Sequence, residues 1–380
     1  MANILDYLAW RGDLTLSERP FNEVDNVILS VLAYLRLDGL GLGPGQIVLL
    51  EEVIRRYRAQ DTQSYSEWNN PEQLLDALRQ SARFGGMGVS NYVNELDAEK
   101  QLQFAAMTFH LEDGSIYVAF RGTDATLTGW REDFNTTYLS ETPGQALAVR
   151  YLEDIASRTR GVIRVGGHSK GGNLAVYAAA FAPEGVRYRI QVAFSNDGPG
   201  FNSKVSDTME YRSILDRVTL IVPETSLVGI LLNNKEDKII VRSSASGARQ
   251  HSPYTWLVKG ACFERAEKQA PASIFLDSAM EQWSESLTDA QKEKIISSVF
   301  DALEQGGMTT LQDVKDDKAQ ALGSLLRSVR GSDDTTLRDA GIGLLRLLQA
   351  GGSAVVGTLQ EKIDELRRDR KDGDDHDGQA

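Results

Sequence analysis

The chain has 380 residues, of which 41% are hydrophobic and 25% are charged. These fractions are those of a globular protein, so a disordered or fibrous class is excluded for most of the chain. The formal net charge of −13 is expected to repel phosphate backbones and anionic membrane surfaces, and no basic run in the sequence opposes it. We therefore expect no nucleic-acid partner.

Redox and metal chemistry are not indicated by the residue types present. A single cysteine, Cys262, has no internal partner for a disulfide, and four histidines leave little for a metal cluster. The sequence thus predicts neither a metal nor a cofactor. The first residues, MANILD, include an acid where a secretory signal carries basic residues, and no stretch reaches the length of an apolar membrane span. We expect a cytoplasmic protein without stable membrane insertion.

Secondary-structure patterns along the chain predict an α/β fold. Residues 1–80 are expected to be helical, because apolar residues recur at steps of three and four within residues 21–35. From Leu102 the period becomes that of strands, with a hairpin signal at residues 112–114. Strands and helices then alternate, which is typical of a mostly parallel, doubly wound sheet. The expected elements are helices at 144–157 and 173–182 and strands at 162–165, 189–195, 217–222 and 238–243.

Beyond residue 243 the strand signal fades, and the chain is expected to continue as helices. Helical patterns over residues 285–369 are interrupted at glycine pairs and at a Gly-Ser pair, and the last residues are charged throughout. We divide the chain into an α/β domain with its N-terminal helices (1–284), a helical extension (285–369) and a disordered tail (370–380). The extension offers a surface for a possible protein partner. The expected interruptions are at residues 306–307, 331–332 and 351–352.

The stretch VIRVGGHSKGGNLAVYAAA, residues 162–180, places a serine between a β-branched run and a helix-favouring run. It contains G-x-S-x-G with Ser169 at its centre, the turn on which α/β-hydrolases hold their nucleophile. Gly167 and Gly171 would meet the need for small residues beside the strand and helix. The amide of Lys170, at the helix N-terminus, would face the anion formed when Ser169 attacks a carbonyl. In the alternative interpretation, Ser169 is an N-cap and the glycines only form a turn.

A second amide donor is expected from the loop after an earlier strand, in YVAFRGTDATLTGWREDF, residues 117–134. The combination of VAFRGTD, GWREDF and GGHSKGGNLA resembles the class 3 lipases, and the N-terminal sequence resembles a bacterial family of uncharacterised proteins in the same α/β-hydrolase group. The resemblance covers roughly residues 3–260. It implies that the amide of Thr123 forms the oxyanion hole and that Trp130 and Asp133 are buried and brace the loop. For Arg121, Trp130 and Asp133 we favour an ordinary buried ion pair beside an aromatic over a direct catalytic role.

The order of triad residues in this fold is serine, acid, histidine, so the base must follow Ser169. Only His251 and His376 do so, and His376 lies in the charged tail. We therefore predict His251 as the base, with a loop histidine of no catalytic role as the alternative. His168 and His110 are expected to be structural.

Two carboxylates compete for the role of the acid. Asp197 follows the strand after the nucleophile helix and is flanked by turn-forming residues, so it is expected at the carboxyl edge of the sheet. Class 3 lipases carry an aspartate one strand later, where this chain has Glu224 instead. We favour Asp197, keep Glu224 as the alternative acid, and note that Asp197 could instead form an Asx turn.

These residues predict a serine hydrolase of lipase or esterase type, acting on a small-molecule or lipid acyl ester. Ser169 would be the nucleophile, His251 the base and Asp197 the acid. The apolar run SLVGILL, residues 226–232, could line an acyl pocket, although a buried element is the simpler use of such residues. The competing hypothesis is a catalytically inactive hydrolase-fold protein that binds partners through its C-terminal helices.

Overall fold

The structure is a computed structural model, and it describes residues 1–60, 71–226, 228–229, 232, 234–271, 273–274, 287–328, 341–345 and 348–349. It divides into two compact units, Met1–Glu293 and Lys294–Ala380. The boundary falls within helix α12 (Asp289–Gln305). The expected interruptions at 331–332 and 351–352 and the expected tail at 370–380 lie outside the described residues.

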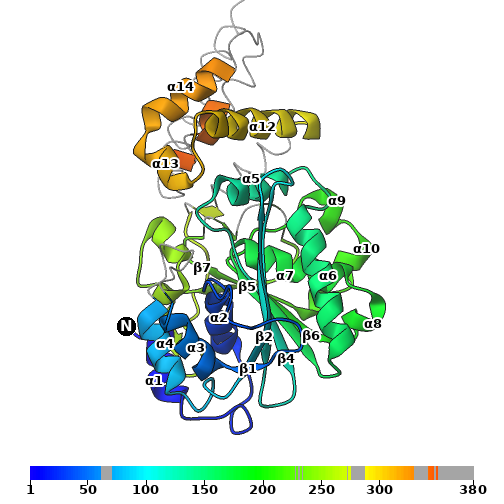
Figure 1. Cartoon of the computed structure of the whole chain (residues 1–380), viewed down its shortest axis with the longest axis vertical. Helices are drawn as coiled ribbons and strands as arrows, with labels where there is room; N and C mark the ends of the chain where they lie inside the picture. Colours follow the sequence, from blue (N-terminus) through cyan, green and yellow to red (C-terminus); the bar gives the residue numbers. More distant parts are fainter. Residues whose placement is uncertain are drawn as a thin grey trace, which may run out of the picture. The chain divides into compact units, whose positions relative to one another are not determined.

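An eight-stranded sheet forms the centre of the first unit (Figure 1). The strands lie side by side in the order of the sequence, β1 to β8. Neighbours are antiparallel from β1 to β4 and parallel from β4 to β8, so the expected α/β fold with a mostly parallel sheet is present. The strands are β1 (Val48–Leu49), β2 (Gly88–Asp97), β3 (Leu102–His110), β4 (Ile116–Phe120), β5 (Ile163–His168), β6 (Ile190–Asn196), β7 (Val218–Pro223) and β8 (Lys238–Val241).

The parallel strands are wound in one direction, so the prediction of a doubly wound sheet is wrong. A doubly wound sheet needs a reversal of strand order, and the order here has none. Right-handed crossovers that advance in one direction place their helices on one face of the sheet. That face packs against α6 (Pro143–Arg158) and α7 (Lys170–Phe181). The same crossovers also contain the short helices α8 (Glu184–Arg187), α9 (Ser203–Ser206) and α10 (Met209–Arg212).

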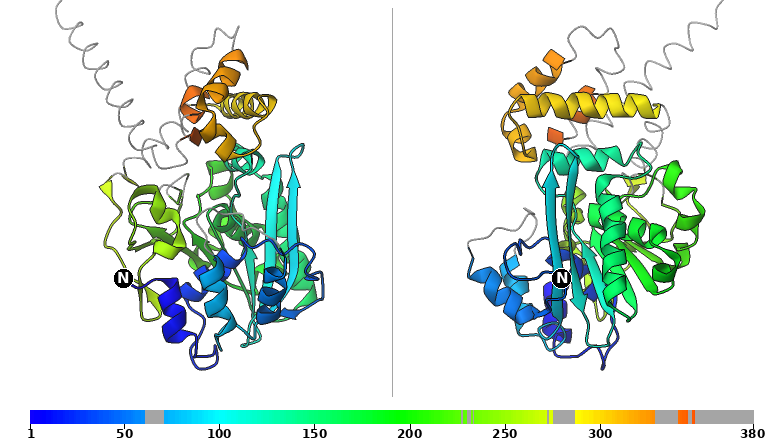
Figure 2. Two further views of the ribbon diagram at one scale, coloured as in Figure 1. Left: turned by 60° about the vertical axis from the view of Figure 1, so that its left-hand side comes forward. Right: turned by 45° about the vertical axis from the view of Figure 1, so that its right-hand side comes forward.

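The N-terminal helices cover the opposite face and build a second apolar core there (Figure 2). The helical pattern expected at 21–35 forms the most deeply buried of them, with nearly every side chain removed from solvent. Its N-terminus is capped by Asn22, whose side chain accepts from two backbone amides. These helices are α1 (Ile4–Arg11), α2 (Glu23–Leu32), α3 (Leu50–Arg58) and α4 (Pro71–Arg79).

Buried polar residues of α2 hold the ends of β5 and β6. The Asn26 side-chain amide donates to Asn196 Oδ1 over 2.8 Å, and the Asn196 side-chain amide donates to the carbonyl oxygen of Gly167 over 3.0 Å. All of these groups are buried, where an unpaired amide would be costly, so the bonds fix the relative position of helix and strands. Helix α2 is therefore part of the support beneath the carboxyl edge of the sheet.

The second unit is helical in its described part, as expected for the extension. Its helices are α12, α13 (Leu311–Asp316) and α14 (Lys318–Ser328). Helix α12 ends at Gln305, directly before the expected interruption, and Gly307 has a positive φ of 80° that favours glycine. Among all described residues, no helix combines the length and apolar character needed to cross a membrane.

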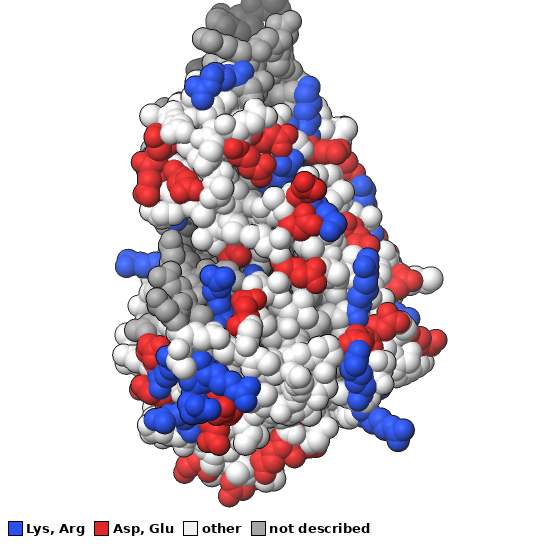
Figure 3. All heavy atoms as spheres, in the orientation of Figure 1, with Lys and Arg blue, Asp and Glu red and all other residues white. Residues whose placement is uncertain are grey.

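Charged side chains of both signs are interspersed on the face shown in Figure 3. Basic side chains gather over α3 and α4, and they are paired with acids from the same helices. Arg55 and Arg56 both contact Glu52, and Arg58 contacts Asp76. The charge of this cluster is therefore largely balanced locally.

Candidate active site

Ser169 occupies a sharp turn between β5 and α7. Its φ of 58° and ψ of −133° lie outside the conformations common for a non-glycine residue. A side chain at Gly167 would clash with the backbone of Gly171, and one at Gly171 would clash with the carbonyl of Phe120. Close backbone packing therefore requires small residues on both sides of the serine, as the sequence predicted.

The Ser169 hydroxyl does not cap α7, which disfavours the N-cap interpretation. The residue precedes the helix, yet no capping hydrogen bond from its side chain is present. Its amide donates to the carbonyl of Asn196 over 3.0 Å, and the residue is partly exposed. The backbone is thus tied to the neighbouring strand, while the hydroxyl is not committed to the helix.

His251 and Asp197 lie together at the carboxyl edge of the sheet. His251 ends the 3₁₀ turn η2 (Gly247–His251), which follows β8, and Asp197 directly follows β6. His251 Nδ1 is 2.6 Å from Asp197 Oδ2. The other carboxylate oxygen, Oδ1, accepts from the Ser226 hydroxyl over 2.5 Å and from the Gly229 amide over 3.1 Å. Both oxygens of this fully buried carboxylate are therefore used.

Glu224, the alternative acid, occupies a different position. It follows β7, and its backbone amide donates to Val241 O over 3.0 Å. Within the described part of the chain, its side chain forms no hydrogen bond or ion pair with His251. The carboxylate that contacts the imidazole is that of Asp197, which is also too fully bonded to serve only as a turn residue.

Ser169 and His251 are both at the same edge, but no hydrogen bond between their side chains is found among the described residues. In hydrolases this contact often tightens only when substrate is bound. Both residues remain partly exposed, whereas Asp197 between them in the chain is buried.

The loop after β4 lies against the turn that holds Ser169. A side chain at Gly122 would overlap the Tyr34 hydroxyl and lie 2.6 Å from the carbonyl oxygen of His168 and 3.1 Å from Ser169 Cβ. Thr123 follows, and its hydroxyl donates to Asp133 Oδ2 over 2.5 Å. The two backbone amides proposed for the oxyanion hole, those of Thr123 and Lys170, donate to no acceptor within the described residues. Within the part of the chain that the structure describes, both amides are available to an anion.

Trp130 and Asp133, which were expected to be buried and to brace this loop, are both partly exposed. Asp133 does bond to Thr123, and its Oδ1 is buried without a hydrogen-bond partner among the described residues. Burial raises the pKa of Asp133 to about 7. Trp130 belongs to helix α5 (Leu127–Asn135) and is not among the buried residues of that helix. Arg121 contacts Asp124 at 3.5 Å, in keeping with a buried structural pair.

A buried ion pair behind the serine was not predicted from the sequence. Lys170 Nζ lies 3.0 Å from Glu132 Oε2 and donates to the carbonyl and side-chain oxygens of Gln103 over 2.8 and 2.6 Å. Glu132 also accepts from the Gly144 amide over 2.6 Å. Lys170 is the first residue of α7, and its buried side chain therefore ties the start of that helix to β3 and α5. No local pattern in the sequence links these distant positions.

The other histidines are placed as follows. His110 in β3 contacts Ser90 Oγ over 2.7 Å, and burial lowers its pKa. His168 packs beside His251, with ring centroids 4.4 Å apart. His376 lies outside the described residues. In the described part of the chain, no group of His, Cys, Asp and Glu side chains has an arrangement suited to a metal ion.

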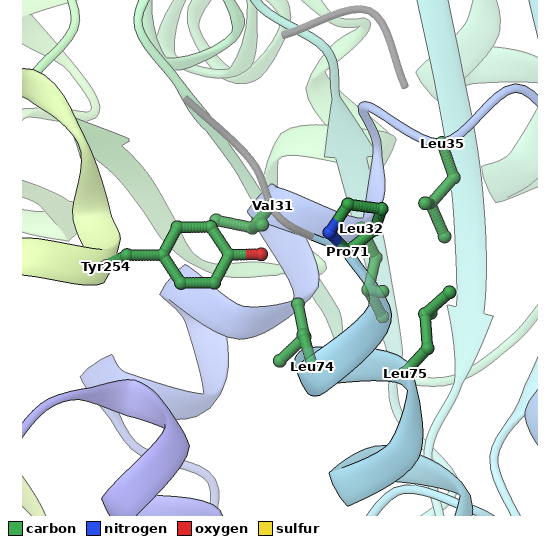
Figure 4. A pocket seen from close by; sticks show the side chains of 7 residues that line it. All are labelled: Val31, Leu32, Leu35, Pro71, Leu74, Leu75 and Tyr254. Atoms are coloured by element: carbon green, nitrogen blue, oxygen red, sulfur yellow. The ribbon is translucent and has the colours of Figure 1, made fainter. Parts of the chain in front are cut away.

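Neither of two cavities in the described part of the chain is lined by Ser169, Asp197 or His251. The first, of about 10 Å³, is lined by apolar side chains of α2 and α4 and by Tyr254, whose hydroxyl points into it (Figure 4). This volume is about that of one water probe, too small for an acyl chain. The second, of about 330 Å³, includes Arg11, Arg19 and Arg83 and no candidate catalytic residue. In the expected acyl-pocket run, positions 227, 230 and 231 are outside the described residues.

The α/β fold, the serine on a strained strand-to-helix turn and the histidine–aspartate pair define a hydrolase-like protein. The family model described as Mbeg1-like matches residues 78–301, which is more than half of the chain. The chain therefore belongs to the Mbeg1-like family, a lipase-like family of the class 3 type. No curated protein matches it. The resemblance to class 3 lipases is confirmed at this level.

Proposed function

We propose that the protein is a serine hydrolase that cleaves a carboxylic ester through an acyl-enzyme. The observation that carries the proposal is the bond of 2.6 Å between His251 Nδ1 and the buried carboxylate of Asp197, formed beside the strained Ser169 turn. A histidine held through Nδ1 presents Nε2 as the acceptor for a serine proton. Membership in a lipase-like family supports acyl transfer as the reaction class.

In the first step, a bond forms between Ser169 Oγ and the ester carbonyl carbon as the serine proton passes to His251 Nε2. The Asp197 carboxylate stabilises the resulting imidazolium and keeps its Nδ1–H oriented. The amides of Thr123 and Lys170 bind the negatively charged oxygen, and each such donor lowers the barrier by about 3 kcal/mol in known hydrolases. The alcohol then leaves with the proton from His251.

In the second step, water takes the place of the serine. His251 accepts a proton from water, the hydroxide attacks the acyl carbon, and the bond to Ser169 breaks with return of the proton. The two steps consume only the ester and water, and they need neither a metal nor an organic cofactor. The substrate class is an acyl ester of a small molecule or lipid.

The test is hydrolysis of p-nitrophenyl esters with acyl chains of increasing length by the wild type and by Ser169→Ala. We expect a burst of p-nitrophenol equal to the enzyme concentration in the wild type and no burst in the variant, because the acyl-enzyme forms on Ser169. Absence of turnover and of any burst in folded wild-type protein would contradict the proposal and favour an interaction protein that retains the hydrolase fold.

A further inference from the structure

The imidazole of His168 contacts the loop that holds His251. Its Nε2 lies 2.7 Å from the backbone carbonyl oxygen of His251, and its ring packs on the His251 ring with centroids 4.4 Å apart. His168 is the residue before Ser169 and is buried. One side chain of the nucleophile turn therefore supports both the backbone and the ring of the histidine proposed as the base.

These contacts define the protonation state of His168. A carbonyl oxygen only accepts, so Nε2 must carry a proton that it donates to His251 O. Burial and the nearby His251 lower the pKa of His168 well below its ordinary value, so the ring is neutral and Nδ1 is an acceptor. Nδ1 accepts from the Tyr34 hydroxyl over 3.0 Å. His168 is thus held in one tautomer by partners on both sides.

Tyr34 extends the connection to the oxyanion loop, which is the loop after β4 that holds Gly122 and Thr123. Gly122, which immediately precedes Thr123, packs directly against the Tyr34 hydroxyl, because a Cβ at Gly122 would overlap the Tyr34 oxygen. Tyr34 is buried and lies two residues beyond the end of α2. Gly122 therefore packs on the Tyr34 hydroxyl, and hydrogen bonds continue from Tyr34 to His168 and from His168 to the carbonyl of His251.

We propose that Tyr34 and His168 are positioning residues for catalysis. They hold three segments at fixed distances: the turn of Ser169, the oxyanion loop and the loop of His251. The proposal rests on the serine hydrolase function proposed above. The first two segments follow the paired strands β5 and β4, whereas the loop of His251 follows β8, which pairs with neither of them. Displacement of a reacting group by about 1 Å costs roughly a hundredfold in rate, which makes such a connection valuable.

The test measures the second-order rate at which a fluorophosphonate labels the full-length protein. The variants are Tyr34→Phe, His168→Gln and His168→Leu, with Tyr7→Phe as the matched control. Tyr7 is also a buried tyrosine of the N-terminal helices, and its hydroxyl bonds to Asp25 over 2.8 Å. The control thus loses a buried hydroxyl and its hydrogen bonds away from Ser169.

We expect labelling to slow by at least about tenfold in Tyr34→Phe and His168→Leu and to stay near the wild-type rate in Tyr7→Phe. Glutamine places an N–H near the position of His168 Nε2, so His168→Gln should recover part of the rate lost in His168→Leu. A merely structural role would lower thermal stability without this recovery. If His168→Leu does not fold, Tyr34→Phe and His168→Gln still decide the question.

The tautomer gives a second readout that does not require activity. In ¹⁵N-histidine NMR spectra of the wild type, the His168 signals should report a neutral ring protonated at Nε2, and Tyr34→Phe should shift the Nδ1 signal. A ring protonated at Nδ1 overturns the inference. So does equal labelling of Tyr34→Phe and the wild type. Failure of the wild type itself to label overturns the proposed function and the positioning role together.

Discussion

Ser169 and Asp197 follow adjacent parallel strands, and both have a positive φ, 58° and 50°, although neither is glycine. Such backbone conformations cost about 1–3 kcal/mol each and persist where surrounding contacts enforce them. Here the enforcing contacts are close packing around the serine turn and hydrogen bonds to both oxygens of the aspartate. The strain is found at the two residues to which the proposed reaction assigns the nucleophile and the acid.

The identity of the acid can be tested with two matched substitutions. Asp197→Asn should lower kcat for ester hydrolysis by at least about a hundredfold with little change in KM, because a neutral amide no longer stabilises the imidazolium. Glu224→Gln should change kcat by less than about tenfold. Steady-state kinetics on one ester measures both values. The opposite pattern would assign the acid to the end of β7.

The buried Lys170–Glu132 pair should be important for stability. Glu132→Gln leaves the Lys170 ammonium buried without its counter-charge, and we expect it to lower the free energy of unfolding by about 3–5 kcal/mol. The control is Glu52→Gln, which removes a partly exposed partner of Arg55 and Arg56 and should have no measurable effect. Denaturant titration of both variants measures the difference. Equal stabilities would show that the buried pair is not needed by the fold.

Gly122 should not accept a side chain. In Gly122→Ala the new Cβ would overlap the Tyr34 hydroxyl and approach the carbonyl of His168, so the oxyanion loop must move away from Ser169. We expect fluorophosphonate labelling to slow by more than about tenfold and stability to fall by about 1–3 kcal/mol. Gly185→Ala is the control, since a Cβ there meets no atom within 4 Å. Normal labelling of Gly122→Ala would contradict the close packing described for this loop.

Asp133 should make stability depend on pH. Its pKa is raised by burial from the ordinary 3.8 to about 7, so the folded state binds its proton more tightly than the unfolded state does. The associated stabilisation is fully present below pH 3.8 and is lost as pH rises through about 7. Asp133→Asn carries no such charge. Its free energy of unfolding relative to the wild type should therefore increase over that pH range, as measured by denaturant titration at successive pH values.

A difference between the two proteins that stays constant with pH would contradict the raised pKa of Asp133. Asp133→Asn keeps the short hydrogen bond from the Thr123 hydroxyl, because the asparagine can still accept it through its side-chain oxygen. The comparison therefore isolates the charge of the carboxyl group from the hydrogen bond.

Local patterns were sufficient to predict the hairpin of β3 and β4, the alternation of strands and helices, the positions of Ser169 and Asp197 at strand ends and that of His251 in the loop after β8. Strand β2 was missed because a bulge between Ser90 and Val93, with Asn91 at a φ of 54°, interrupts its alternation. The single direction of winding is a property of strand order, which no short stretch encodes.

The missed parts of the candidate site are long-range contacts. Tyr34 and His168 are 134 positions apart, and Lys170 and Glu132 are 38 apart. Taken alone in the sequence, Tyr34 is typical of a core tyrosine, and His168 is only the residue before the serine. Lys170 and Glu132 are typical of surface charges. Only the folded chain shows that the tyrosine and histidine join three loops and that the lysine and glutamate neutralise each other within the core.

The most direct measurement is mass spectrometry of the full-length protein after reaction with a fluorophosphonate, followed by peptide mapping. A nucleophilic serine displaces fluoride and forms one phosphonyl ester. We predict a single adduct on Ser169, absent from Ser169→Ala, whose thermal stability should remain that of the wild type because its hydroxyl makes no capping bond. An adduct on another serine, or no adduct on folded wild-type protein, would contradict the assignment of Ser169 as the nucleophile.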